Sequence, residues 1–185
     1  VVKELETVGL SYDDILEDYC RTGFGAAAES VKEYFLRCEK LAGPTPATFT
    51  PEAVTELRGL LEAARQPAGV DEAVRKRVAF LRAGLEFTAI SGEAYRLVDD
   101  ASEGRTVDRP AAHQLLDRRW SLMREIVRRE PLAVNAALVA GNEGHVWRGL
   151  RWSGPSDRTV RSAQETPATE AWLYEDQTQL PAVPK

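Results

Sequence analysis

The sequence is poor in the residues that most often carry chemistry. Its 185 residues include only two cysteines, two histidines and one methionine. Cys20 and Cys38 are too few for a disulfide framework, and they lie too far apart for a zinc knuckle. Both fall in helical patterns, so we expect buried free thiols, with a disulfide between helices as the alternative in an oxidising compartment.

Long hydrophobic runs and an excess of positive charge are also missing. No apolar run approaches the roughly 18 residues that a membrane-spanning helix needs, so we expect no membrane span. The chain has 24 Lys and Arg against 29 Asp and Glu, a net charge of −5. Binding of DNA or RNA backbones requires a basic face, so we expect no nucleic-acid partner. With 43% hydrophobic residues, the chain can bury a core without disulfides or metal.

The first residues of the chain carry no processing signal. Val1-Val2-Lys3-Glu4 contains neither an initiator Met nor a basic segment followed by an apolar one. We therefore expect this chain to be a piece of a longer protein.

Helical periodicity dominates the first three quarters of the sequence. Four residues that favour helix N-caps, Ser11, Thr50, Asp71 and Asp108, precede segments with apolar side chains every three or four positions. The predicted helices are 12–23, 27–41, 51–64, 72–98 and 109–130, with 132–140 as one more short candidate.

These patterns predict an all-α protein, a bundle of about five or six mostly antiparallel helices over residues 1–140. Residues 141–185 contain Gly, Pro and Trp without helical period, and we expect an irregular extension that packs on the bundle or leads to another domain. The fourth helix would span about 42 Å, more than the roughly 32 Å diameter of a compact domain of this length. We expect either a bend at Ser91-Gly92 or an elongated domain.

The sequence lacks the motifs of cofactor and catalytic sites. There is no phosphate loop, no dinucleotide-binding glycine motif, no His-Glu-x-x-His and no Gly-x-Ser-x-Gly, so we predict no cofactor and no metal. His113 and Asp117 stand four residues apart, which is more typical of a helix-surface contact than of an oriented catalytic imidazole. The acidic clusters are better explained by helix N-termini and solvation than by acid–base catalysis. They comprise Asp13, Asp14, Glu17 and Asp18, and Asp99, Asp100 and Glu103.

Five arginines crowd the fifth predicted helix. Acidic residues are interleaved with them, so the pattern indicates a solvated, ion-paired face rather than a phosphate-binding stripe. They are Arg118, Arg119, Arg124, Arg128 and Arg129.

One aromatic cluster stands out after the last helix, formed by His145, Trp147, Arg148 and Trp152. Indole faces can stack on sugar rings while Arg or His binds hydroxyls or a uronate carboxylate, which makes these residues candidates for carbohydrate binding. The alternative is that the indoles close the open end of the bundle or cover a surface that meets another domain. Trp172 and Tyr174 are candidates for a second anchor of the extension.

The segment from Asp14 to Tyr95 resembles the start of the helical domain in a family of large, uncharacterised proteins related to alpha-glucuronidases and other glycoside hydrolases. Similar features follow the first two helices, namely the Thr-Pro-Glu helix start at Thr50 and the pairs Leu60-Leu61 and Arg77-Val78. The positions that match in the first two helices are Tyr19, Phe24, Gly25, Ala27, Ala28, Val31 and Tyr34.

This resemblance implies a C-terminal helical domain that lies behind a TIM-barrel, glycosidase-like domain. The chain itself has no alternating strand pattern for a barrel, so no catalytic residue is carried over. The implied partners are the barrel domain of the parent protein, a second copy and carbohydrate, and related proteins are often exported. We therefore expect a non-catalytic accessory domain, a scaffold or dimerisation face. The alternatives are a carbohydrate-binding module that uses the aromatic cluster and, least favoured, an independent enzyme.

Overall fold

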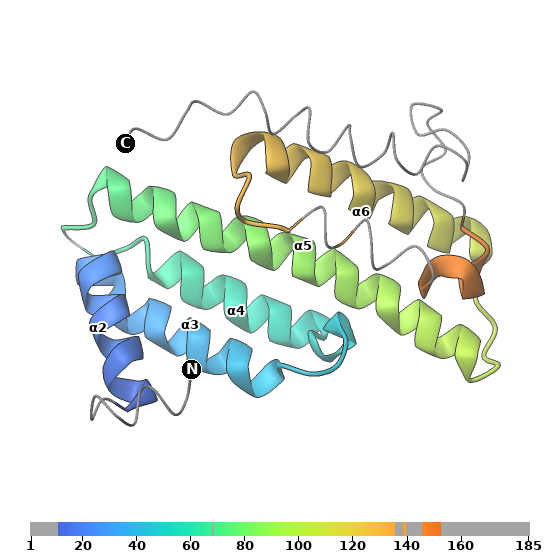
Figure 1. The fold of residues 1–185 in the computed structure, drawn as a ribbon, viewed down its shortest axis with the longest axis horizontal. Coiled ribbons are helices and arrows are strands. Elements are labelled where there is room, and N and C mark those ends of the chain that lie inside the picture. The colour runs from blue at the N-terminus through green and yellow to red at the C-terminus, as the bar shows by residue number, and fades with distance from the viewer. Residues whose placement is uncertain (1–10, 68, 136–138, 140–145, 153–185) are drawn as a thin grey trace. The chain divides into compact units, whose positions relative to one another are not determined.

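The computed structural model describes residues 11–67, 69–135, 139 and 146–152 (Figure 1). Every regular element in these ranges is helical, which confirms the all-α class. The α-helices are α2 (Tyr12–Phe24), α3 (Ala28–Leu41), α4 (Pro51–Ala63), α5 (Glu72–Ser102) and α6 (Arg109–Arg129). The 3₁₀ helices are η1 (Gly25–Ala27), η2 (Pro46–Thr48) and η3 (Val146–Leu150). None of the described helices combines the length and the apolar character that a membrane span requires.

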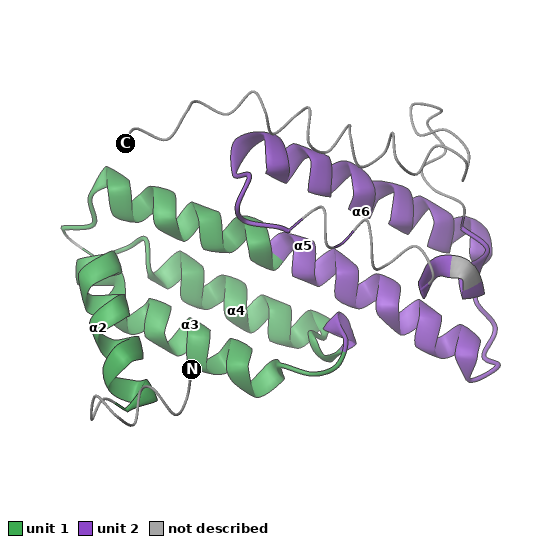
Figure 2. Ribbon diagram, viewed as in Figure 1, with its two compact units in different colours: residues 1–44, 48–85 green, residues 45–47, 86–185 purple. Residues whose placement is uncertain are grey.

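The chain divides into two compact units (Figure 2). Unit 1 comprises residues 1–44 and 48–85, and unit 2 comprises residues 45–47 and 86–185. Helix α5 contributes its first part to unit 1 and its second part to unit 2. The expected domain boundary at residue 140 falls outside the described residues, as does most of the expected short helix 132–140. A single bundle of five or six helices stays a prediction.

The helices begin where their cap residues predict. The Ser11 hydroxyl accepts a hydrogen bond from the backbone N–H of Asp14, whose carboxylate in turn accepts from the backbone N–H of Ser11. This reciprocal capping box satisfies two donors that the first turn of a helix leaves without partners. The side chains of Thr50, Asp71 and Asp108 accept equivalent bonds at the starts of α4, α5 and α6.

Helix α5 is longer than the sequence predicts. It has 31 residues, continues through Ser91-Gly92 and includes Asp99 to Ser102, which lie beyond the predicted end of this helix at residue 98. The helix ends before Gly104, whose φ is +75°, and the backbone N–H of Arg105 bonds to the carbonyl of Asp100 at 2.8 Å. This is the Schellman pattern, in which a glycine adopts a left-handed conformation just after a helix. The polar residues before Gly104 therefore extend the helix, because none of them is a breaker.

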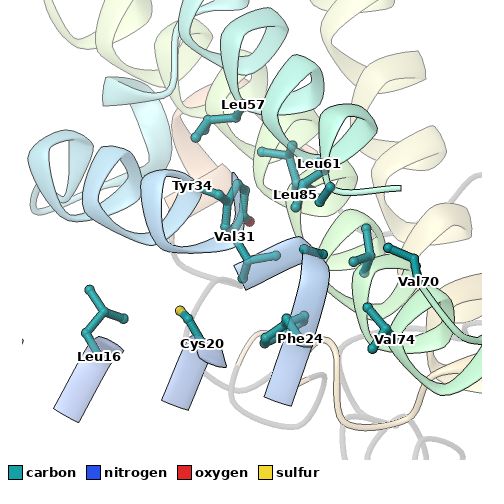
Figure 3. Packing of buried hydrophobic residues seen from close by; sticks show 13 residues of the cluster. Leu16, Cys20, Phe24, Val31, Tyr34, Leu57, Leu61, Val70, Val74 and Leu85 are labelled. Atoms are coloured by element: carbon teal, nitrogen blue, oxygen red, sulfur yellow. The ribbon is translucent and has the colours of Figure 1, made fainter. Parts of the chain in front are cut away.

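The core of unit 1 forms where one face of each of its helices meets the others (Figure 3). Leu16, Cys20 and Phe24 lie in one row along α2 at intervals of four residues. This row packs in one cluster with residues of the other helices, among which Val31, Leu57 and Val78 are fully buried. The apolar periodicity that predicted the helices therefore accounts for most of this core, although Tyr19, which belongs to the same pattern of α2, is 53% exposed.

Gly25, which follows α2, adopts a backbone conformation that other residues rarely tolerate. Its φ is +51° and its ψ is −118°, and its N–H bonds to the carbonyl of Arg21. An added Cβ would meet no atom within 4 Å, so the cost of a side chain here is backbone strain alone. We expect Gly25→Ala to lower the free energy of unfolding by about 1–3 kcal/mol, measured by urea denaturation.

Gly59 offers the matched control for this substitution. It lies inside α4, and a Cβ built there also meets no atom within 4 Å. Alanine favours a helix interior over glycine by about 1 kcal/mol, so Gly59→Ala should raise stability. If the two substitutions changed the free energy of unfolding equally, the backbone at Gly25 would not be strained.

Candidate functional site

The described part of the predicted aromatic cluster lies in unit 2, where η3 packs on residues of α5 and α6. Trp147 is 2% exposed, and its ring meets the ring of Tyr95 edge to face with 5.0 Å between the centroids. Ala112, Leu115 and Leu116 of α6 belong to the same hydrophobic cluster. Trp147 therefore acts as an apolar anchor that holds η3 in the core of this unit.

A buried arginine is the second component of this arrangement. Arg119 of α6 is 2% exposed, and its Nε donates to the hydroxyl of Ser91 on α5 at 2.8 Å. Its guanidinium carbon lies 4.6 Å from the centroid of the Phe87 ring and 5.1 Å from that of Trp147. Aromatic faces attract a cation and shield it from water, so the two rings help to stabilise the buried charge.

The position of Arg119 corrects the sequence interpretation, which placed all five arginines on a solvated face. A local signal was available, because Arg119 falls within the apolar stripe of α6, between Leu116 and Met123. The residues that surround its guanidinium were not visible, since Phe87 and Ser91 lie about 30 positions earlier and meet Arg119 only when α5 and α6 pack.

His113 and Asp117 hold the same segment from the surface of α6. The Nε2 of His113 lies 2.8 Å from the carbonyl oxygen of Leu150, and a carbonyl only accepts, so the imidazole donates this bond. The indole N–H of Trp152 donates to Asp117 at 3.1 Å. The spacing of four residues thus serves structural contacts with the last residue of η3 and with Trp152, which follows it.

The arrangement bears on the two interpretations of the aromatic cluster. His145 and the side chain of Arg148 lie outside the described residues, as do Trp172 and Tyr174. Trp147 is buried, so its indole presents no open platform for a sugar ring, while Trp152 is partly buried and its N–H donates to Asp117. These contacts favour the packing alternative over sugar stacking.

The acidic clusters take part in local contacts as well. Asp14 belongs to the capping box, and hydrogen bonds from Ser11 lower the pKa of its carboxyl. Asp18 forms an ion pair with Arg21 at 2.9 Å. Glu17 pairs with Lys32, while Asp100 and Glu103 both contact Arg105. Carboxylates that cap a helix or pair with cations at the surface in this way lack the desolvation that a general acid requires.

Thiol or metal chemistry has no support among the described residues. Cys20 is buried, Cys38 is partly buried, and both are free thiols. Burial raises the pKa of each thiol, so the reactive thiolate is disfavoured. No group of three or more His, Cys, Asp or Glu side chains converges in the described ranges as a metal site would require.

Unit 1 carries a hollow that sequence reasoning did not single out, which we call the α2 groove. Its volume is about 760 Å³, and Tyr19 in its middle is 53% exposed although its ring meets Phe24 and Phe35 edge to face. Its residues are Asp14, Ile15, Asp18, Tyr19, Thr22, Gly23, Phe24 and Arg77. The lining positions recur every four residues along α2, so the groove follows one side of this helix.

Arg77 of α5 closes the C-terminal end of the α2 groove. Its Nη1 donates to the carbonyl oxygen of Gly23, in the last turn of α2. The last carbonyls of a helix lack partners within the helix, and a cation there also complements the helix dipole. The groove therefore has a carboxylate, Asp14, at one end and a guanidinium at the other.

Comparisons with family models, with curated proteins and with solved structures find no match to this chain. The resemblance to the helical domain of glycosidase-like proteins therefore stays a prediction that rests on the residues quoted for it.

Proposed function

We propose that this chain is a non-catalytic helical accessory domain of a larger carbohydrate-active protein, in which it serves as a scaffold or association surface. One observation carries the accessory role. The residues of unit 2 that could bind a ligand, Trp147, Arg119 and His113, make internal contacts that fasten η3 to α5 and α6. Side chains used in this way stabilise the fold and leave little for a substrate to bind.

Electrostatic properties of the described residues support the same role. Acid–base catalysis needs titratable groups that are desolvated and convergent in a cleft. Asp14, Asp18 and Asp100 of the acidic clusters are instead partners in a helix cap and in ion pairs with arginines. The groove that does occur has an apolar floor and a charge at each end, which is typical of a surface that binds another protein.

The carbohydrate context of the proposal comes from the resemblance of Asp14 to Tyr95 alone. With that resemblance, the proposal includes a barrel domain of the same parent protein as partner and one bundle of five or six mostly antiparallel helices. A barrel-bearing parent would supply the catalytic carboxylates from the ends of its barrel strands.

Titration with sugars separates the accessory role from the carbohydrate-binding alternative. We expect the intrinsic Trp fluorescence of the chain to stay unchanged with xylo- and glucurono-oligosaccharides up to millimolar concentrations, because Trp147 is buried and Trp152 is hydrogen-bonded. The chain should also fail to hydrolyse these sugars.

The control for this titration is Trp152→Phe, which keeps an aromatic ring but removes the N–H that bonds to Asp117. Saturable quenching in the unmodified chain that is lost in this variant would refute the accessory role. It would establish a sugar site at the aromatic cluster.

A further inference from the structure

We propose that the α2 groove is a self-association surface that binds the same groove of a second copy of this chain. This self-association rests on the accessory role proposed above, because that role makes association the function of the domain. The proposal names the face that associates and its partner.

The floor of the α2 groove provides the apolar contact. Ile15 and Tyr19 are adjacent on one side of α2, one turn apart, and both retain exposed surface. Tyrosine combines a large apolar ring with a polar tip and is enriched where proteins meet. The ring of Tyr19 is held by Phe24 and Phe35, so little side-chain freedom is lost when a partner covers it.

The charges of the groove are arranged to complement themselves. Asp14 bonds to the neutral Ser11 and Arg77 bonds to a neutral carbonyl, so neither contact neutralises their charges. The remaining carboxylate, Asp18, is already offset by Arg21. Each groove thus presents a negative end and a positive end in balance, despite the net charge of −5 on the chain.

A two-fold axis brings these ends together. In a symmetric pair, if one residue contacts another across the interface, the reciprocal contact also forms. Asp14 and Gly23, which bonds to Arg77, are about 13 Å apart along α2, and Tyr19 lies near the middle. Two antiparallel α2 helices that cross at Tyr19 would therefore place each Asp14 beside Arg77 of the other copy.

The size of the groove sets the strength of this association. A helix of 13 residues is about 20 Å long, and a strip about 10 Å wide along it covers on the order of 200 Å² per copy. Stable dimers bury about 800 Å² per partner. We therefore expect a weak, reversible dimer that forms only toward millimolar concentrations of the chain.

Sedimentation analysis of the full chain from about 10 μM to about 1 mM tests the proposal. The unmodified chain should pass from monomer to dimer over this range. Asp14→Arg and Arg77→Asp should each abolish the dimer, because each variant places like charges at both ends of the paired grooves.

An equimolar mixture of the two charge variants should recover the dimer. In a mixed pair, the arginine introduced at position 14 of one copy faces the aspartate introduced at position 77 of the other. At the opposite end, the original Asp14 and Arg77 face each other. Asp13→Arg is the matched control, because it makes the same charge change beside the groove, and it should leave the dimer unchanged.

Two further results keep the test decisive. If circular dichroism shows that the charge variants are unfolded, Thr22→Arg replaces them in the test, because Thr22 is an exposed residue of the groove. This variant should weaken the dimer by at least about tenfold. A monomer at about 1 mM, or a dimer that Thr22→Arg leaves unchanged, would overturn the proposal. A dimer that also binds sugar would refute the proposed accessory role and leave the self-association surface intact, so the two failures are distinguishable.

Discussion

Replacement of Trp147 by alanine should lower the free energy of unfolding by about 3–5 kcal/mol, the cost typical of removing a buried tryptophan. The indole is 2% exposed, meets Tyr95 edge to face and lies 5.1 Å from the guanidinium carbon of Arg119. The substitution would leave a cavity and remove an aromatic face from a buried charge. Urea denaturation followed by Trp fluorescence measures this loss in unit 2, because the remaining tryptophans of the chain all fall in its residue range.

Trp147→Phe provides the graded control. A phenyl ring keeps an aromatic surface against Tyr95 and Arg119, so the loss should be only about 1–2 kcal/mol. If alanine at this position cost less than about 1 kcal/mol, Trp147 would not anchor η3. Its candidacy as a sugar-binding residue would then regain support.

Replacement of Leu57 by alanine should be similarly costly in unit 1, at about 2–5 kcal/mol. Leu57 on α4 is fully buried in the cluster that includes Val31, Leu61 and Val78. Removing its branched end would leave a cavity lined by side chains from other helices, which relax only in part. Since small and medium domains are stable by about 5–15 kcal/mol, this change removes a large fraction of the total. Urea denaturation followed by circular dichroism at 222 nm would measure it.

Leu132→Ala is the matched control, because the same atoms are removed from a side chain that is 85% exposed. A substitution without buried contacts typically changes stability by no more than about 0.5 kcal/mol. Equal losses in the two leucine variants would show that Leu57 does not belong to a packed core.

The helical elements could be predicted because their signals are local. Ser11, Thr50, Asp71 and Asp108 accept hydrogen bonds from backbone groups only three residues away, so the sequence neighbourhood contains both partners. The end of α5 was mislocated because polarity after Val98 was given more weight than the glycine at position 104, where the left-handed conformation ends the helix.

The candidate site was less predictable because its parts come from distant segments. The sequence indicated Trp147 and Trp152 as candidates for carbohydrate binding, but the burial of each indole depends on which residues of other segments cover it. Tyr95 and Arg119 belong to other helices and reach Trp147 only after these helices pack. The α2 groove was missed for the same reason, since Arg77 lies more than 50 residues after the helix it completes.

The sequence by itself determined the all-α class, the starts of α2, α4, α5 and α6, and most of the apolar positions that form the core of unit 1. These depend on periodicity and on hydrogen bonds within one turn of a helix, both of which a linear chain encodes directly. Only the tertiary structure decided that Arg119 is buried against two aromatic rings, that Trp147 faces inward, and that α2 borders a groove with opposite charges at its ends. Burial and charge pairing are properties of surfaces from separate helices, and they exist only once those surfaces are in contact.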